Sequence, residues 1–225
     1  MKCKCINLFI ALLFLFFIAG CGSRTLPEEF EKAYSAFQRI EAAHYTTINS
    51  LAGEESAHAE YYWDGENSIY TSWNEESTVH THVYTTPNGQ YTSQMIPENT
   101  DGPYLLYPAS DPHDYHRIYN IDIDQLSRSF QSVTTENNIT KVTFSFEPEK
   151  NETLVYHIKD GKIVCVEILY SPAITNADGT SVNIEMTSTY NILDIAKHEA
   201  EEIIASTAAD FDLQDIAPTM PTPPQ

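Results

Sequence analysis

The spacing of apolar and polar positions predicts one helix near the start of the chain and β-strands after it. From Pro27 to Leu51, apolar and aromatic residues recur every three or four positions, and Gly53 follows. This period is typical of an amphipathic helix that buries one face, and a glycine is a common helix end. Beyond it, short segments rich in β-branched and aromatic residues alternate with turn residues, as in a meander of antiparallel hairpins. The strands expected in this half are 57–63, 68–73, 78–85 and 90–96.

Prolines interrupt the pattern between Pro97 and Asp114, where four of 18 residues are proline. An irregular stretch of this length inside a domain is typical of a functional loop or a lid. Strand-like and helix-like patterns then resume, and the segment at 182–193 alternates so that one face should meet water. The elements expected here are a short helix at 122–131, strands at 139–147, 153–159, 162–170 and 182–193, and a helix at 195–209.

The dipeptide Asp160-Gly161 is the best hairpin signal in the chain, because both residues tolerate the positive φ of a two-residue turn. Such a loop pairs Lys159 with Lys162 and Tyr156 with Cys165. Both faces of the hairpin are then apolar, so we expect this part of the sheet to be covered on both sides. The face with Tyr156 holds Leu154, Ile158, Ile163 and Cys165, and the other holds Val155, Val164, Val166 and Ile168.

The first residues of the chain have the pattern of an export signal. Lys2 and Lys4 precede an uncharged run of 11 residues, Leu8 to Ile18. This run is shorter than the roughly 20 residues of a membrane-spanning helix, but it suits the core of a signal peptide. The sequence Ile-Ala-Gly-Cys that ends at Cys21 resembles a bacterial lipobox. That resemblance implies cleavage before Cys21, a diacylglycerol on its thiol, and attachment to the lipid bilayer at the extracytoplasmic face of the cell membrane. The alternatives are an ordinary secretory signal or an uncleaved N-terminal anchor.

Charge and cysteine content narrow the classes of function. The chain has 32 acidic and 12 basic residues, so its net charge of −20 disfavours nucleic acid as a partner. Of its four cysteines, Cys3 and Cys5 leave with the signal and Cys21 is acylated. Cys165 then remains alone, so the mature chain has no intramolecular disulfide. Because Cys165 lies in a β-rich run, we expect a packed core thiol rather than a nucleophile.

Motifs for catalysis and metal binding are absent or incomplete. The chain has no Gly-x-Ser-x-Gly elbow, no His-Glu-x-x-His and no phosphate-binding loop, so we expect neither an enzyme nor a cofactor. His80 and His82 lie two residues apart on one expected strand, and the segment 111–116 holds further histidines and aspartates. Neither group has an identifiable complete ligand set, so no metal site is assigned.

Aromatic residues concentrate between Tyr61 and Tyr119, with nine tyrosines and two tryptophans. They pack well in strands, which is one interpretation. The other is that amphipathic rings line a groove for a ligand beside the proline-rich loop. The candidate groove residues are Trp63, Trp73, Tyr84, Tyr91, Tyr104 and Tyr107.

The order of elements over about residues 27–193 is similar to that of the LolA/LppX-like lipoproteins of bacterial envelopes. The segments 159–164 and 186–192 are the most alike. The resemblance implies an α+β fold in which a strongly curved antiparallel sheet, a half-barrel, packs on the N-terminal amphipathic helix and shorter helices. In that family the cleft between sheet and helices holds acyl chains. No functional residue other than Cys21 is carried over from it.

The expected organisation is therefore a signal peptide (1–20), a lipidated tether (21–26), a single β-rich binding domain (27–209) and an acidic, proline-rich, disordered tail (210–225). The expected function is that of a membrane-anchored, non-catalytic lipoprotein that binds an amphiphilic or lipid-like ligand. An envelope protein interaction or assembly factor is the alternative, and a cell-wall glycan binder is a third class.

Overall fold

The computed structural model describes residues 25–85, 91–97, 105–108, 121–146, 152–175 and 180–209. Its helices in these ranges are α2 (Glu28–Phe37), α4 (Ile123–Ser129) and α5 (Lys197–Ala209). The strands are β1 (Ala43–Leu51), β2 (Glu54–Trp63), β3 (Ser68–Trp73), β4 (Thr78–Thr85), β5 (Tyr91–Pro97), β6 (Leu105–Pro108), β7 (Phe130–Glu136), β8 (Ile139–Phe146), β9 (Glu152–Lys159), β10 (Lys162–Tyr170), β11 (Ala173–Thr175), β12 (Ser181–Asn183) and β13 (Met186–Leu193).

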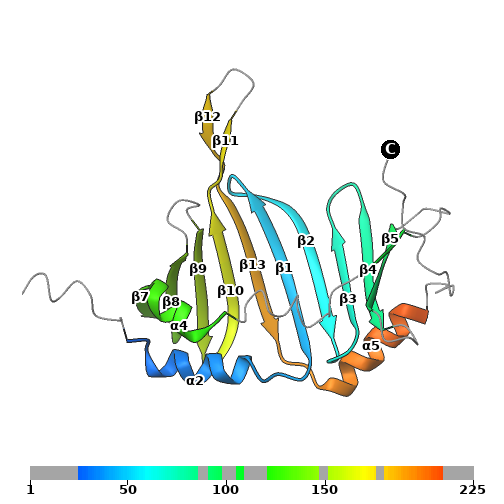
Figure 1. Cartoon of the computed structure of the whole chain (residues 1–225), viewed down its shortest axis with the longest axis horizontal. Coiled ribbons are helices and arrows are strands. Elements are labelled where there is room, and N and C mark those ends of the chain that lie inside the picture. The colour runs from blue at the N-terminus through cyan, green and yellow to red at the C-terminus, as the bar shows by residue number, and fades with distance from the viewer. Residues whose placement is uncertain are drawn as a thin grey trace, which may run out of the picture.

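Eleven of these strands form one open antiparallel sheet (Figure 1). Their order is β6-β5-β4-β3-β2-β1-β13-β10-β9-β8-β7, so strands from both halves of the chain meet where β1 pairs with β13. The ribbon of β11 and β12 projects from one end of the sheet (Figure 1). The α+β class with a large antiparallel sheet, expected from the sequence, is confirmed.

Helix α2 covers the part of the sheet formed by β8, β9 and β10. The ring of Phe30 lies 5.1–5.4 Å from the rings of Tyr34, Phe144 and Tyr156. The hydroxyl of Tyr34 donates a hydrogen bond of 2.7 Å to the carbonyl of Ile121, just before α4. Burial raises the pKa of Tyr34 to about 12, so the phenol stays a protonated donor. This core joins α2, α4 and the sheet into one body.

Helix α5 packs on the same sheet near β1, β2 and β3. Its buried residues are Ala200 and Ile204. Beside it, Tyr45 and Tyr61 stack with ring centroids 4.7 Å apart, in a second core that also includes Trp63. Three half-buried residues contact both cores: Ile40, Tyr190 and Ile192.

The expected helix over 27–51 is wrong beyond Phe37. Residues Ala43–Leu51 form β1 instead, with Ala43, Tyr45 and Thr47 buried on alternate positions. Strands β2 and β13 both pair with β1 along its length, so the backbone of this segment forms hydrogen bonds on both sides. The spacing of apolar residues within the segment gives no information about these partners. Gly53, at φ +86°, lies in the turn between β1 and β2 rather than at a helix end.

The Asp160-Gly161 hairpin forms as expected, with Lys159 opposite Lys162, but the further register is wrong. An irregularity between Ile163 and Cys165 shifts the pairing, so Cys165 lies opposite His157, and Val166 lies opposite Tyr156. A bulge of one residue moves every later side chain to the other face. Val166 therefore joins the core under α2, and the predicted pair of two apolar faces does not form.

Two other expectations differ. The helix predicted at 122–131 ends at Ser129, and the strand β7 that follows was not anticipated, because its mostly polar and exposed residues give no alternating pattern. The strand predicted at 182–193 is divided into β12 and β13. Residues of β13 before Leu193 are half-buried on both faces, so the expected water-facing side is only partly exposed.

The expected signal peptide, Cys21, most of the proline-rich stretch and the tail lie outside the described residues. Within the ranges described, neither α2, α4 nor α5 has the length and apolar content to cross a bilayer.

Candidate ligand-binding pocket

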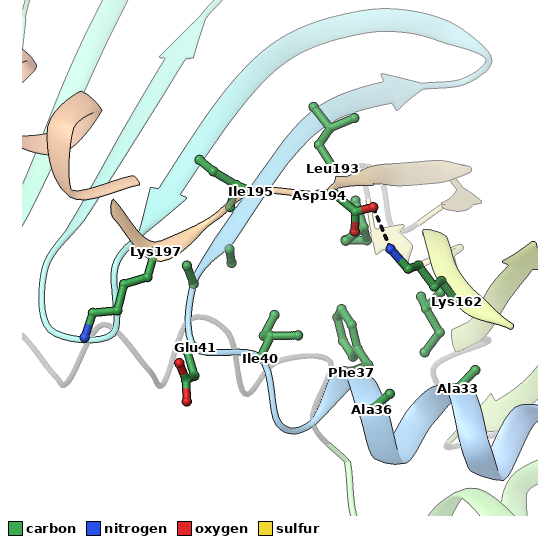
Figure 2. A pocket seen from close by; sticks show the side chains of 14 residues that line it. Ala33, Ala36, Phe37, Ile40, Glu41, Lys162, Leu193, Asp194, Ile195 and Lys197 are labelled. Atoms are coloured by element: carbon green, nitrogen blue, oxygen red, sulfur yellow. Dashed lines mark hydrogen bonds and ion pairs between the residues drawn. The ribbon is translucent and has the colours of Figure 1, made fainter. Parts of the chain in front are cut away.

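A pocket of about 440 Å³ opens where the end of α2 approaches the start of α5 (Figure 2). Its wall includes the ends of β1, β10 and β13, which lie side by side at the centre of the sheet. This volume lies within the range of about 300–1,000 Å³ that is usual for small-molecule sites. The lining residues are Ala33, Ala36, Phe37, Ile40, Glu41, Ala42, Ala43, Lys162, Ile163, Ile192, Leu193, Asp194, Ile195 and Lys197.

The pocket lies where two helices cover different parts of the sheet. Helix α2 covers β8–β10 and α5 covers β1–β3. Between them the wall carries methyl side chains at Ala33, Ala36, Ala42 and Ala43, which leave space that larger residues would fill. Ile40 forms the link between the two cores beside this space.

The floor of the pocket is apolar and its rim is charged. Figure 2 shows Phe37 and Ile40 on one side of the space, and Lys162 and Asp194 on the other. The ammonium of Lys162 lies 2.6 Å from a carboxylate oxygen of Asp194, and both side chains are exposed. Lys197 lies 4.0 Å from Glu201. Exposed pairs of this kind are weak, so either lysine can exchange its partner for an anionic group of a ligand.

The turn between β2 and β3 supports this rim. Gly65 has φ +101°, and a Cβ built there would lie 3.2 Å from the backbone oxygen of Glu41 and 3.7 Å from Nζ of Lys197. Glycine thus permits a close approach of the turn to two residues that line the pocket.

Of the residues predicted to line an aromatic groove, Trp63 and Trp73 are not among the described residues that line this pocket. Trp63 is 3% exposed and lies in the second core, with Tyr45 and Tyr61. Trp73 pairs with His58, while Trp63 pairs with Ser68, so the two tryptophans lie on opposite faces of the sheet and do not line one groove. The side chains of Tyr84, Tyr91, Tyr104 and Tyr107 lie outside the described residues, so their part in a groove stays a prediction.

The two histidines of β4, His80 and His82, differ in their surroundings. His80 and His82 do lie on one face of β4, opposite Thr71 and Ile69. His80 Nδ1 is 3.0 Å from the hydroxyl of Thr71. His82 is 4% exposed, and burial lowers its pKa to about 4, against a smaller opposing effect of Asp64. The segment 111–116 lies outside the described residues.

Sequence reasoning missed the pocket because its lining comes from several separate segments. The alanines at 33 and 36 lie three residues apart on α2, and Ala42 and Ala43 lie where the chain enters β1. Small residues among large apolar ones are a signal for space, but only if the segments are known to meet.

Comparison of the chain with protein-family models and with characterised protein sequences finds no match.

Proposed function

We propose that this protein is an extracytoplasmic lipoprotein, anchored through acylated Cys21, whose domain binds the apolar part of an amphiphile in the pocket between α2 and α5. The observation that carries the proposal is the pocket itself, with its apolar floor and charged rim. The protein acts by binding rather than by catalysis. As in the LolA/LppX-like lipoproteins, a half-barrel sheet and its helices enclose the space that holds the acyl chain.

The position of the pocket supports this assignment. In that family, acyl chains lie between the helices and one face of the sheet, and the lining of this pocket likewise comes from α2, from the start of α5 and from strands of the sheet. Lys162 and Lys197 stand at its rim, where an ammonium would meet a phosphate or carboxylate head group. The chain as a whole is acidic, with a net charge of −20, and these two lysines are 2 of its 12 lysines and arginines.

Burial of an acyl chain supplies the binding energy. Each methylene removed from water contributes about 0.8 kcal/mol. Shortening a bound chain by two methylenes should thus weaken binding by about 1.6 kcal/mol, roughly 15-fold in Kd. A pocket of 440 Å³ is at the small end of the usual range, so we expect a single chain to enter rather than several.

Photolabelling of the full-length protein in membranes tests the pocket. The probe is a lysophospholipid with a diazirine in its single acyl chain, and the labelled peptides are mapped by mass spectrometry. We expect labelling in the segments around Ala36 and Ile163, and we expect unlabelled lysophospholipids to compete more strongly as their chains lengthen.

A matched pair of variants separates pocket binding from general membrane contact. Ala36→Phe adds a ring at an exposed position of the pocket lining, whereas Ala205→Phe adds the same ring at an exposed position of α5 that does not line the pocket. Labelling should fall at least about tenfold in the first variant and stay unchanged in the second. Equal labelling in both would contradict the proposal, and a specific crosslink to one envelope protein instead would favour an assembly factor.

The anchor has its own test. Metabolic labelling with an alkyne analogue of palmitate should mark the natural chain and leave Cys21→Ala unmarked. A Cys21→Ala protein that still carries the label would refute the assignment of Cys21.

A further inference from the structure

A group of three potential metal ligands lies on the sheet face opposite the helices. It consists of His157 on β9 with Cys165 and Glu167 on β10. One imidazole nitrogen, the thiol sulfur and one carboxylate oxygen all lie within 4.8 Å of one another. His157 and Cys165 are each 9% exposed, and the side chain of Glu167 is 29% exposed. The group is therefore nearly enclosed, with one side toward solvent.

The bulge in β10 creates this group. Without the shift between Ile163 and Cys165, the thiol would lie opposite Tyr156 and face α2. With it, Cys165 lies directly opposite His157, and Glu167 follows two residues later on the same face. Three donor types thus converge because of one irregularity in an otherwise regular hairpin. β-Bulges often redirect side chains in this way beside functional sites.

We propose that His157, Cys165 and Glu167 bind one divalent transition-metal ion of the Zn²⁺ class, with solvent in a fourth position. A nitrogen, a thiolate and a carboxylate are the ligand types that Zn²⁺ accepts, and three protein ligands leave one position open. The harder ions Ca²⁺ and Mg²⁺ take oxygen ligands and do not suit a thiolate.

The distances are close to those that a tetrahedral site requires. Nε2 of His157 lies 3.2 Å from Oε2 of Glu167. At metal–ligand distances of about 2.0–2.2 Å, nitrogen and oxygen ligands of a tetrahedral zinc ion stand about 3.4 Å apart, so this pair needs almost no movement. A sulfur ligand at about 2.3 Å stands about 3.6 Å from the nitrogen, so from a separation of up to 4.8 Å the thiol must approach by at most about 1.2 Å.

The electrostatic surroundings set the proton balance of binding. Burial and the charge of Glu167 raise the pKa of Cys165 to about 11, while Lys141 lowers it. The thiol is thus protonated at neutral pH when no metal is present. On binding, the S–H bond breaks, a sulfur–metal bond forms and the proton passes to solvent. Lys141 lies opposite His157 on β8, and its exposed side chain can turn away from the incoming cation.

This ion site and the amphiphile pocket are on opposite faces of the sheet, so each can exist without the other. A bound ion would link β9 to β10 beside the bulge and would stabilise that part of the sheet.

Titration with Co²⁺ tests the proposal on the full-length protein in detergent, after treatment with a chelator and a thiol reductant. Cobalt replaces zinc in tetrahedral sites and absorbs light when bound to a thiolate. We expect one equivalent to give a thiolate-to-cobalt charge-transfer band, and an excess of Zn²⁺ to remove it. Cys165→Ser should abolish the band, and His157→Gln and Glu167→Gln should weaken binding at least about tenfold.

The matched control is His44→Gln. His44 Nε2 lies 2.8 Å from Oε1 of Glu60, so this histidine–carboxylate pair in the same sheet is closer than the pair of His157 and Glu167 but does not belong to the group with Cys165. This variant should bind cobalt as the natural protein does. Circular dichroism of each variant confirms that it is folded, and Glu167→Gln is the least disruptive of the ligand changes because the side chain of Glu167, at 29% exposed, is the least buried of the three.

Two results would overturn the proposal. One is the absence of a charge-transfer band in the natural protein, which would leave the group as an ion pair beside a packed thiol. The other is a band that persists in Cys165→Ser, because the other cysteines would then be the ligands.

Discussion

The buried imidazole of His82 should make the protein lose stability in mild acid. His82 is 4% exposed on β4, and burial lowers its pKa from 6.5 to about 4. The folded state thus holds a neutral imidazole between these two pH values, while the unfolded chain binds a proton there. Stability is fully present above pH 6.5 and is lost as the pH falls toward 4.

The size of this effect follows from the two pKa values. At about 1.4 kcal/mol per pKa unit, the whole gap corresponds to roughly 3 kcal/mol, of which about 2 kcal/mol is lost by pH 5. For a domain with a typical stability of about 5–15 kcal/mol, this is a large fraction.

Urea unfolding followed by tryptophan fluorescence, at pH 7.5 and pH 5, measures it. The perturbation is His82→Gln, which removes the titrating group but keeps a polar side chain. We expect the natural protein to lose about 2 kcal/mol more than the variant between the two pH values, because the carboxylates are common to both. His198→Gln, an exposed change on α5, should keep the full pH dependence. An identical loss in the natural protein and in His82→Gln would refute the reasoning.

Three further predictions concern packing, the turn at the pocket and its rim. Phe30→Ala removes a fully buried ring and should cost about 3–5 kcal/mol in urea unfolding, with Phe30→Leu costing clearly less; equal costs would contradict the packing argument. Gly65→Ala should destabilise more than Gly53→Ala, because both have positive φ but only the first would bring a Cβ to 3.2 Å from backbone oxygen. Melting temperatures of the two variants compare them directly, and a larger drop for Gly53→Ala would be inconsistent with the close approach. Lys162→Ala should change the free energy of unfolding by less than about 1 kcal/mol, because its pair with Asp194 is exposed, and a loss above 2 kcal/mol would show that the pair is structural.

Local sequence patterns correctly predicted several strands and one hairpin turn. The limits of β3, β4 and β10 agree with the expected 68–73, 78–85 and 162–170. Asp160 and Gly161 both have positive φ, as a two-residue hairpin turn requires. The expected burial of Cys165 is also confirmed. Strand composition and turn chemistry act over a few residues, so they can be recognised without the rest of the chain.

The segment at 43–51 shows where such patterns fail. Its apolar positions fit a helical period after Phe37, but alternate residues also fit a strand. Pairing with β13 favours the strand over the helix, although the paired residues Asn191 and Thr46 are 145 residues apart in the sequence. A strand gains its hydrogen bonds and half of its burial from such distant partners. No local pattern contains this information.

The same reason separates the sites from the elements that carry them. The sequence alone determined that the chain is acidic and indicated that it is rich in strands, and it predicts a signal peptide over residues 1–20 before Cys21. Only the tertiary structure decided that α2 and α5 leave a pocket between them, and that one bulge brings Cys165 beside His157. Turns and strands arise from interactions between near neighbours, whereas a site arises from register and from the packing of segments far apart in the chain, where a shift of one residue reverses which face a side chain occupies.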